Sequence, residues 1–223
     1  MWTLLSFRPL KIDGLQLALK MDKQTVQNLD KLIPAISGQL VYVNRKCEAE
    51  IVHQTARTYL LDQVDYPDLV LHKKACHTRI AMLCLTLLAG SFSKGWQPLD
   101  RNAVDHYSAS ASLPDFIDYA CEHFSEHLQR GSSEEDANWE LLRKFLDSNL
   151  LVWIDHLARK RRISSVTRTA KNLRAYFARR VKYLSPISPQ KAIMETWIYD
   201  LFRLGAKFGS SLVLSPSSIY NLI

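Results

Sequence analysis

Residues 50–62 read EIVHQTARTYLLD, and the character of the chain changes within this segment. Glu50 to His53 predict the end of a short strand, since Ile51 and Val52 are β-branched. From Gln54 onward the pattern predicts a helix, and Thr55 is placed to cap its first turn. We therefore expect residues 50–62 to connect a small unit of helices and strands to a longer series of helices.

His53 lies at the centre of this connection and allows two interpretations. It could be a catalytic or metal-binding imidazole, or a histidine whose hydrogen bonds are satisfied at the start of the helix. The sequence around it supplies no partner for either kind of chemistry. We favour the structural interpretation.

The residues before this connection predict a winged-helix-like module. One helix is expected around Leu15, and a second is expected over residues 24–37, ended by Gly38, which adopts positive φ without penalty. Two β-branched or aromatic runs, 40–43 and 48–52, flank a polar turn and predict a hairpin. A two-stranded hairpin is not stable alone, so it must pack on these helices.

The residues after the connection predict an all-helical domain. The fold class is therefore mainly α, with a winged-helix-like module over residues 1–66 and a helical linker domain over residues 67–223. The expected helices run from Leu69 to Ala89, from Pro114 to Leu128, from Trp139 to Ser148, from Leu150 to Ala158 and from Pro189 to Phe208.

Composition limits the class of protein. Of the 223 residues, 47% are hydrophobic and 23% are charged, which is enough apolar material for a core. The longest apolar run, residues 80–89, is far shorter than the roughly 20 residues that span a bilayer. The four cysteines show no CxxC spacing, and no leader segment or glycosylation motif is present, so we predict a cytoplasmic location. The cysteines are Cys47, Cys76, Cys84 and Cys121.

The net charge of +7 is concentrated in one segment. Residues 159–182 contain ten basic residues and no acidic ones, which leaves −3 for the rest of the chain. This segment could bind nucleic acid through phosphate contacts, or Arg159 to Arg162 could be a nuclear import signal. The interpretation we favour is a helix with its apolar residues packed inward and its arginines solvated. The ten are Arg159, Lys160, Arg161, Arg162, Arg168, Lys171, Arg174, Arg179, Arg180 and Lys182.

Two patterns suggest catalytic or nucleotide chemistry, and neither is complete. His123, Glu126 and His127 match H-x-x-E-H, in which two histidines hold zinc and the glutamate activates water, but no firm third ligand follows. Residues 90–95 have two glycines at the spacing of a phosphate-binding loop, but Trp96 and Gln97 stand where lysine and a hydroxyl residue are needed. We therefore predict no catalytic residue, no cofactor-binding residue, no cofactor and no metal ligand.

Several short motifs follow one another along the chain. They are Arg8-Pro9-Leu10 with Ile12 and Leu15; Ile51 to Ala56 with Tyr59 to Leu61; Tyr119-Ala120-Cys121 with His127-Leu128; Phe145-Leu146 with Leu151, Trp153 and Ile154; and Trp197, Asp200-Leu201, Arg203-Leu204, Lys207 to Gly209 and Pro216 to Tyr220 with Leu222-Ile223. In this order they resemble the region that follows the nucleotide-binding module of fungal STAND proteins of the NACHT type, which are NLR-like receptors ending in WD or ankyrin repeats. The early part is also similar to the winged-helix domain of GPI inositol-deacylase-like proteins.

The resemblance implies a non-catalytic regulatory segment that couples a nucleotide-binding module to a repeat sensor. It further implies that the sequence is a fragment of a longer signalling protein and that its partners are proteins, either the adjacent NACHT and repeat domains or a second copy. A different class remains as the alternative, a winged-helix protein that binds nucleic acid through residues 159–182. A zinc hydrolase built on His123 and His127 is a third hypothesis.

Overall fold

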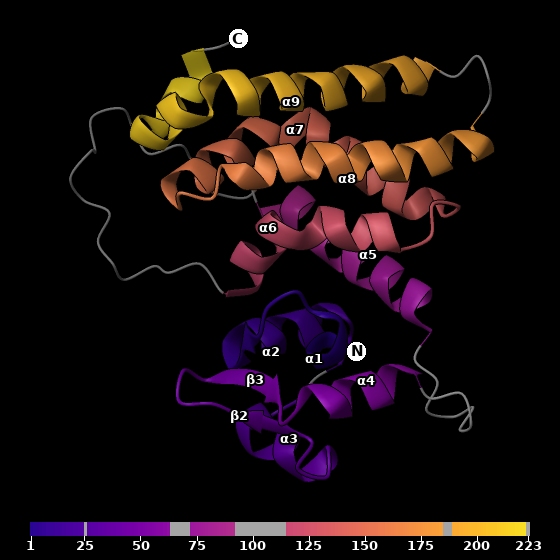
Figure 1. The fold of residues 1–223 in the computed structure, drawn as a ribbon, viewed down its shortest axis with the longest axis vertical. Helices are drawn as coiled ribbons and strands as arrows, with labels where there is room; N and C mark the ends of the chain where they lie inside the picture. Colours follow the sequence, from indigo (N-terminus) through magenta and orange to yellow (C-terminus); the bar gives the residue numbers. More distant parts are fainter. Residues whose placement is uncertain (25, 63–71, 92–114, 185–188, 222–223) are drawn as a thin grey trace.

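The computed structural model describes residues 1–24, 26–62, 72–91, 115–184 and 189–221. Figure 1 shows two bodies, a small mixed module at the bottom and a stack of helices above it. The prediction of a mainly α fold, with a winged-helix module followed by a helical domain, is confirmed. The expected boundary at residues 66 and 67, the helix start at Leu69 and the helix start at Pro114 lie outside the described residues.

The winged-helix module contains a three-stranded antiparallel sheet rather than the two-stranded hairpin that the sequence predicts. The unexpected strand β1 pairs with β3 through Leu10 opposite Ala49 and Lys11 opposite Glu48, giving the order β1-β3-β2. With two residues, β1 is too short to show the alternation that identifies a strand. The elements are α1 (Trp2–Leu5), β1 (Leu10–Lys11), α2 (Ile12–Met21), α3 (Leu29–Ile36), β2 (Val41–Val43), β3 (Glu48–Ile51) and α4 (Gln54–Asp62).

Helix α3 is shorter than the predicted helix over residues 24–37. It begins at Leu29, because Lys23 and Asn28 adopt positive φ angles of 59° and 51° and interrupt a right-handed helix before that point. Its end agrees with the prediction, since Gly38 follows the C-cap with a φ of +58°. The chain then turns at once into β2, so α3 and the sheet are tightly linked.

The start of α4 differs in one detail from the prediction that Thr55 caps the helix. His53 precedes the helix, and its carbonyl accepts the first helical hydrogen bond, from Ala56 N–H at 3.1 Å. The His53 Nδ1 atom accepts from Thr55 N–H at 3.2 Å and lies 2.8 Å from Thr55 Oγ1. His53 is therefore the capping residue, as its structural interpretation implied, and Thr55 lies within the first turn.

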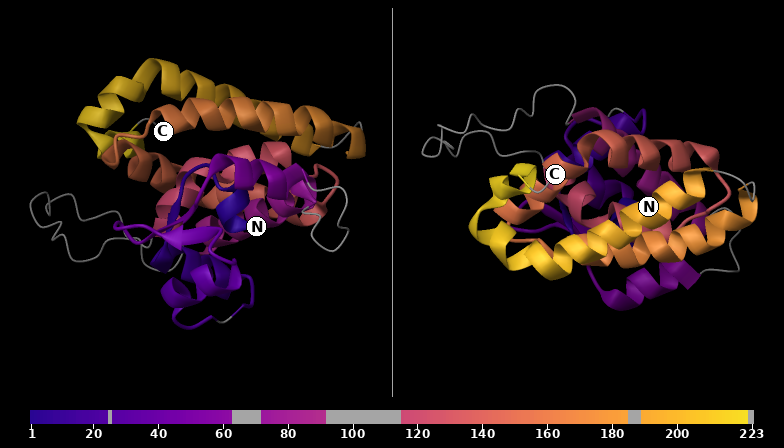
Figure 2. Two further views of the ribbon diagram at one scale, coloured as in Figure 1. Left: turned by 60° about the horizontal axis from the view of Figure 1, so that its bottom comes forward. Right: turned by 90° about the horizontal axis from the view of Figure 1, so that it is seen from above.

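The helical domain packs its helices in layers above the module. In Figures 1 and 2, α8 and α9 run side by side over the top of the domain, while α5 and α6 lie nearest the module. No helix in the described ranges is long and apolar enough to cross a membrane. The elements are α5 (Lys73–Ser91), α6 (Asp115–Arg130), α7 (Asp136–Arg159), α8 (Ser164–Arg180), η2 (Val181–Tyr183), α9 (Pro189–Leu214) and η3 (Pro216–Asn221).

The prediction of two helices meeting near Asn149 is wrong, because α7 runs without a break through that residue. Asparagine is unfavourable in the interior of a helix when its side chain hydrogen bonds to nearby backbone groups in place of the helical hydrogen bonds. Here the Asn149 amide donates instead to the carbonyls of Leu88 and Ala89, at 3.2 and 3.4 Å. Those carbonyls lie in the last turn of α5. Asn149 therefore stabilises two helices.

Helix α9 begins at Pro189 as predicted and ends six residues beyond the expected Phe208. The glycines in its second half serve close packing against α8. A Cβ atom on Gly205 would lie 2.4 Å from Thr167 Oγ1, and one on Gly209 would contact Ile163. Glycine weakens an isolated helix, but here it allows two helices to approach closely.

The interior of the helical domain is aromatic. Phe124, Phe145 and Trp153 are fully buried, and their ring centroids lie 5.2 to 6.0 Å apart in edge-to-face arrangements. The indole N–H of Trp153 donates to the Cys121 carbonyl at 2.9 Å. The largest side chain of this core therefore has its one polar atom satisfied.

Candidate functional site: the contact between the two domains

The two domains meet where Phe7 inserts its ring among three histidines of the helical domain. The ring centroids of His77, His123 and His127 lie 6.2, 5.5 and 4.7 Å from that of Phe7. The guanidinium carbon of Arg130 lies over the Phe7 ring at 4.6 Å, within range of a cation–π interaction. One aromatic side chain of the winged-helix module thus contacts both α5 and α6.

A chain of hydrogen bonds runs behind the Phe7 ring. The Phe7 N–H donates to the Tyr119 hydroxyl at 3.3 Å, and this hydroxyl lies 2.6 Å from His127 Nε2. On the other side of the imidazole, His127 Nδ1 lies 2.8 Å from His77 Nδ1. Each contact is buried or nearly so, and the chain extends from the backbone of the module to α5.

Burial sets the protonation state of this cluster. Removal from water lowers the pKa of His77 to about 4, and the nearby Arg130 charge acts in the same direction. Burial also holds the pKa of His127 well below its ordinary value, assisted by His77, His123 and Arg130. The pKa of Tyr119 is raised, chiefly by burial. Near neutral pH, His77, His127 and Tyr119 are therefore uncharged.

An ion pair adjoins the cluster. Arg8 Nη1 lies 2.9 and 3.0 Å from the two carboxylate oxygens of Asp115, and Arg8 Nη2 donates to the Asp115 carbonyl at 3.2 Å. The backbone N–H of Lys11 donates to the same carboxylate at 2.9 Å. Asp115 is the first residue of α6, where the helix dipole favours a negative charge. It therefore fixes the module against the start of α6.

Helix α2 approaches the start of α6 so closely that only glycine fits. A Cβ atom placed on Gly14 would lie 2.8 Å from the Phe116 nitrogen and 3.1 Å from Asp115 Cβ. Neither α2 nor α6 can yield without a backbone shift, because the contact includes main-chain atoms. Gly14 therefore sets the distance between the domains.

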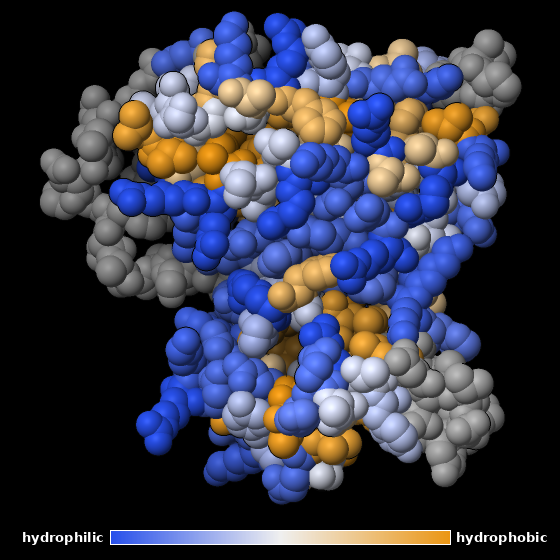
Figure 3. Space-filling view, in the orientation of Figure 1, coloured by the Kyte–Doolittle hydropathy of each residue, from blue (hydrophilic) through white to orange (hydrophobic). Residues whose placement is uncertain are grey.

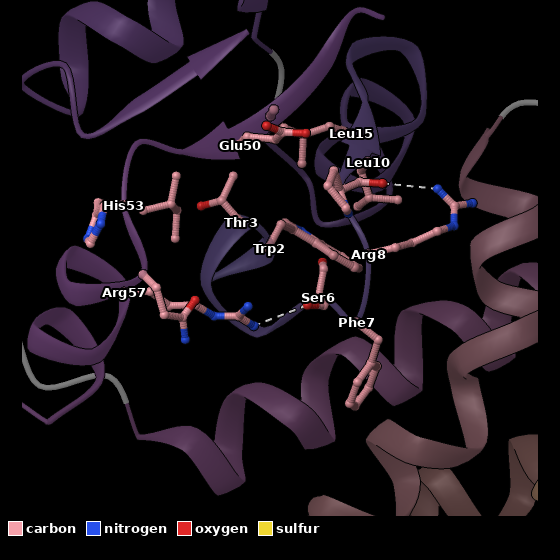
Figure 4. Close-up of a pocket in the computed structure, with 14 residues that line it drawn as sticks. Trp2, Thr3, Ser6, Phe7, Arg8, Leu10, Leu15, Glu50, His53 and Arg57 are labelled. Carbon is pink, nitrogen blue, oxygen red and sulfur yellow. Dashed lines mark hydrogen bonds between the residues drawn. The ribbon is translucent and has the colours of Figure 1, made fainter. Parts of the chain in front are cut away.

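Behind this contact, within the module, lies a cavity of about 210 Å³ bordered by α1, β3 and α4. Figure 4 shows Arg57 of α4 directed toward Ser6, while Phe7 and Arg8 point away toward the helical domain. Arg57 donates to the carbonyls of Leu4 at 2.8 Å and Ser6 at 3.2 Å. The segment that carries Phe7 and Arg8 is thus attached to α4 on one side and to α6 on the other.

The H-x-x-E-H pattern does not form a shared site. Both ring nitrogens of His127 have the partners described above, and its side chain is fully buried. Of the two structural alternatives to a zinc ligand, a helix-face residue or a core residue, His127 is the second. His123 Nδ1 lies 3.3 Å from Glu126 Oε1. Across the described ranges, no group of three or more histidine, cysteine or acidic side chains is arranged to hold a metal ion.

The other predicted patterns have structural roles or fall outside the described residues. Residues 92–97, which include most of the incomplete phosphate-binding loop, are not among those described. Cys84 and Cys121 are buried and their pKa values are raised, chiefly by burial, so both are neutral thiols of the core. Cys76 is half-buried and Cys47 is exposed in the hairpin turn.

Much of the charge in the basic segment is used inside the helical domain. Asp118, Glu122 and Glu126 lie at intervals of four on α6, and therefore on one face of that helix. This face meets the end of α7 and the start of α8. The pairs are Lys160 with Asp118 at 3.1 Å, Arg162 with Glu122 at 4.0 Å and Arg168 with Glu126 at 2.8 Å.

Two further arginines of this segment are also engaged. Arg159 pairs with the buried Asp155 at 2.8 Å. Arg180 is only 3% exposed, which contradicts the expectation that it is solvated, and it pairs with Asp136 and donates to the carbonyls of Ser133 and Glu134. Among the ten, those that remain exposed without a described ion pair are Arg161, Lys171, Arg174 and Lys182. The alternative that this segment binds nucleic acid stays a prediction, and these four side chains are the ones it would use to contact phosphates.

No local pattern in the sequence indicates the contact between the domains. Phe7 and His127 are 120 positions apart, and Arg8 is 107 positions from Asp115. His77 and Tyr119 fit the apolar faces of their helices, so their pattern is that of ordinary core residues. A buried polar contact between two helices cannot be recognised from the sequence of either helix, because it depends on how the helices pack.

Comparison with known proteins agrees with the architecture of the first domain. Residues 1–72 match the family model of the GPI inositol-deacylase winged helix domain. Searches of curated proteins and of solved structures gave no significant match. The match includes every described element from α1 to α4, and with them the segment that carries Phe7 and Arg8.

Proposed function

We propose that this chain is a non-catalytic regulatory segment that transmits movement between neighbouring protein modules. In the finer form of the proposal, it belongs to a cytoplasmic fungal STAND protein of the NACHT type and couples a nucleotide-binding module to a repeat sensor. The winged-helix match over residues 1–72 supports the placement of such a module in the chain. The motif series described above supports the finer form.

The observation that carries the proposal is the double attachment of residues 6–8. Arg57 fixes the carbonyls of Leu4 and Ser6 to α4, and Phe7 and Arg8 fix the next two residues to α5 and α6. A displacement of α4 therefore pulls on Phe7 and Arg8 through a few covalent bonds. Coupling of this kind requires a contact with two arrangements, and a polar contact opens at less cost than an apolar core.

The proposal predicts an effect across the domain boundary when Arg57 is removed. In Arg57→Ala, the hydrogen bonds to the carbonyls of Leu4 and Ser6 are lost. Each bond contributes about 1 kcal/mol, so we expect the protection of the backbone amides of residues 119–121, the first in α6 with helical acceptors, against hydrogen exchange to fall by up to about thirtyfold. Amides near Phe124, deeper in α6, should keep their protection. The measurement is site-resolved exchange by NMR on the whole chain.

The matched control is Arg45→Ala, which removes an exposed arginine from the hairpin turn of the same module. It should leave every amide of α6 unchanged. If Arg57→Ala loosens α1 but leaves the start of α6 as protected as in the natural chain, the two domains are not coupled through residues 6–8 and the proposal is wrong.

A further inference from the structure

The feature that the proposed function leaves unused is the pair of buried imidazoles behind Phe7. His77 and His127 are 6% and 0% exposed, and they face each other through their Nδ1 atoms at 2.8 Å. An imidazole nitrogen in such a pair either donates or accepts. The contact therefore needs one hydrogen between the two Nδ1 atoms.

The hydrogen-bond chain is filled by the protons of the neutral groups. Two neutral imidazoles and one phenol carry three hydrogens on nitrogen or oxygen. When the Tyr119 hydroxyl donates to His127 Nε2, that hydrogen lies between these two atoms, the His127 hydrogen lies between the two Nδ1 atoms, and the His77 hydrogen is on Nε2. The Tyr119 oxygen also accepts from Phe7 N–H. A fourth proton either places two hydrogens between one pair of atoms or leaves the Tyr119 hydrogen without its acceptor.

The surrounding charges also disfavour an added proton. The Arg130 guanidinium lies over Phe7, and that of Arg8 lies 5.5 Å from the centre of the Tyr119 ring. The nearest carboxylate on α6, Glu126, is paired with Arg168 at 2.8 Å and with His123 at 3.3 Å. The titratable or charged groups that act on the pair or on its hydrogen-bond chain are Tyr119, His123, Glu126 and Arg130 on α6, Arg168 on α8 and Arg8 of the module.

We propose that the His77–His127 pair makes the docking of the winged-helix module on the helical domain dependent on pH, so that uptake of one proton by the pair releases Phe7. The inference deepens the proposed function, because it names what regulates the same contact. Phe7 is the group released because its ring contacts both imidazoles and its N–H belongs to the hydrogen-bond chain.

The direction of the effect follows from proton binding in the two states. In the docked structure burial and the Arg130 charge lower the pKa of His77 from its ordinary value of 6.5 to about 4. An open state in which water reaches the His77 ring restores the ordinary pKa, and it therefore holds more protons than the docked state between these values. The docked state is therefore favoured fully above pH 6.5 and loses its advantage as the pH falls toward 4. For one proton, the docking equilibrium weakens about tenfold per pH unit below 6.5, or about thirtyfold between pH 7.5 and pH 5.

The test measures the protection factor of the Phe7 amide in the whole chain from pH 7.5 to pH 5. Because this factor is a ratio to the free amide at the same pH, it reports the opening of the contact. We expect it to fall about thirtyfold, while the amide of Phe124 in the α6 core changes less than twofold. A parallel fall of both amides would indicate general unfolding and would overturn the inference.

Variants test whether the response of Phe7 to pH comes from His77 and His127 or from another histidine. His72→Gln, which changes an exposed histidine just before α5, should keep the full response to pH. The double variant H77Q/H127Q keeps amide groups that can hydrogen bond but do not titrate, and it should dock at both pH values. If that variant does not fold, titration of the histidine rings in the natural chain decides. Protonation of His77 near pH 6.5 with Phe7 still protected would reject the inference.

The two experiments fail independently. An effect of Arg57→Ala on α6 without any response of Phe7 to pH would leave the proposed function standing and remove only the histidine switch. A response of Phe7 to pH without an effect of Arg57→Ala would show a contact that opens but does not transmit movement from α4.

Discussion

Around Trp153 the helical domain is stabilised by aromatic rings packed edge to face, whereas around Phe7 the two domains meet through three histidines, a tyrosine and two arginines. Both regions contain buried aromatic side chains, but only the second depends on charge and on hydrogen-bond direction. Figure 3 shows the junction of the two bodies from outside, with hydrophilic residues along its flanks and some hydrophobic residues between them.

The difference teaches which part of the molecule can move. Opening an apolar core costs a large free energy, because apolar surface that was buried becomes exposed to water. The contact between the two bodies also has an apolar part, since Trp2 of α1 packs edge to face on Phe116 of α6 with ring centroids 5.2 Å apart. Its hydrogen bonds and its ion pair, however, exchange many of their bonds with water and lose much less free energy on opening. We therefore expect the bundle to stay folded while the module separates.

The largest expected effect is on the bundle. Trp153→Ala removes a fully buried ring and should lower the free energy of unfolding by about 3–5 kcal/mol. Urea unfolding followed by circular dichroism measures it. Tyr199→Ala, at a side chain that is 61% exposed, should change the stability by less than about 0.5 kcal/mol. A loss below about 1 kcal/mol in Trp153→Ala would contradict the assignment of the aromatic cluster as the centre of stability.

A smaller effect is expected at the junction of the two bodies. Gly14→Ala places a methyl group 2.8 Å from the Phe116 nitrogen and should weaken docking by about 1–3 kcal/mol, without unfolding α6. The matched control is Gly90→Ala, where the added methyl group meets nothing within 4 Å and should stabilise α5 by up to about 1 kcal/mol. Exchange of the Phe7 and Phe116 amides reports docking in both variants. Unchanged exchange in Gly14→Ala would show that α2 can move away at little cost.

The smallest expected effects compare two arginines of α8. Arg168 pairs with Glu126 and donates to the Glu122 carbonyl at 3.2 Å, so Arg168→Ala should lower stability by about 1 kcal/mol. Arg174 is exposed, and Arg174→Ala should change stability by less than about 0.5 kcal/mol. Urea midpoints at low and high salt give both values. Equal losses in the two variants would mean that the row of ion pairs between α6 and α8 contributes nothing.

Exposed and paired basic residues of α8 also allow a test of the alternative that this protein binds nucleic acid. If the basic segment binds duplex DNA, reversing Lys171 and Arg174 should abolish binding and reduce its dependence on salt, because these side chains are free to contact phosphates. Reversing Arg168 would instead disrupt the domain. Binding that survives the first change would place any nucleic-acid contact elsewhere.

Much of the architecture could be predicted because it follows from local patterns. The hairpin, α2, the end of α3 at Gly38 and the start of α9 at Pro189 depend on residues within a few positions of one another. The predictions that are wrong concern places where a contact with a distant part of the chain overrides the local pattern. Helix α7 continues through Asn149 because carbonyls at the end of α5 accept its side-chain hydrogen bonds, and β1 forms only because β3 lies beside it.

The site was less predictable than the fold. H-x-x-E-H at His123 to His127 is compatible with zinc, with a solvated helix face and with a core, and the pattern alone cannot separate them. The decisive neighbour is His77, which lies fifty positions away and satisfies His127 Nδ1. The charges of the basic segment could likewise be counted from the sequence, but their pairing with α6 could not.

The order of apolar and polar residues in the chain determined that it forms a short winged-helix unit followed by long helices, because hydrophobic periodicity and turn residues act over one or two turns. Only the tertiary structure decided which polar side chains are buried, which arginines are neutralised and where the two domains touch. Those outcomes depend on Coulomb and hydrogen-bond energies between groups up to 120 positions apart, which become large only when folding removes the intervening water.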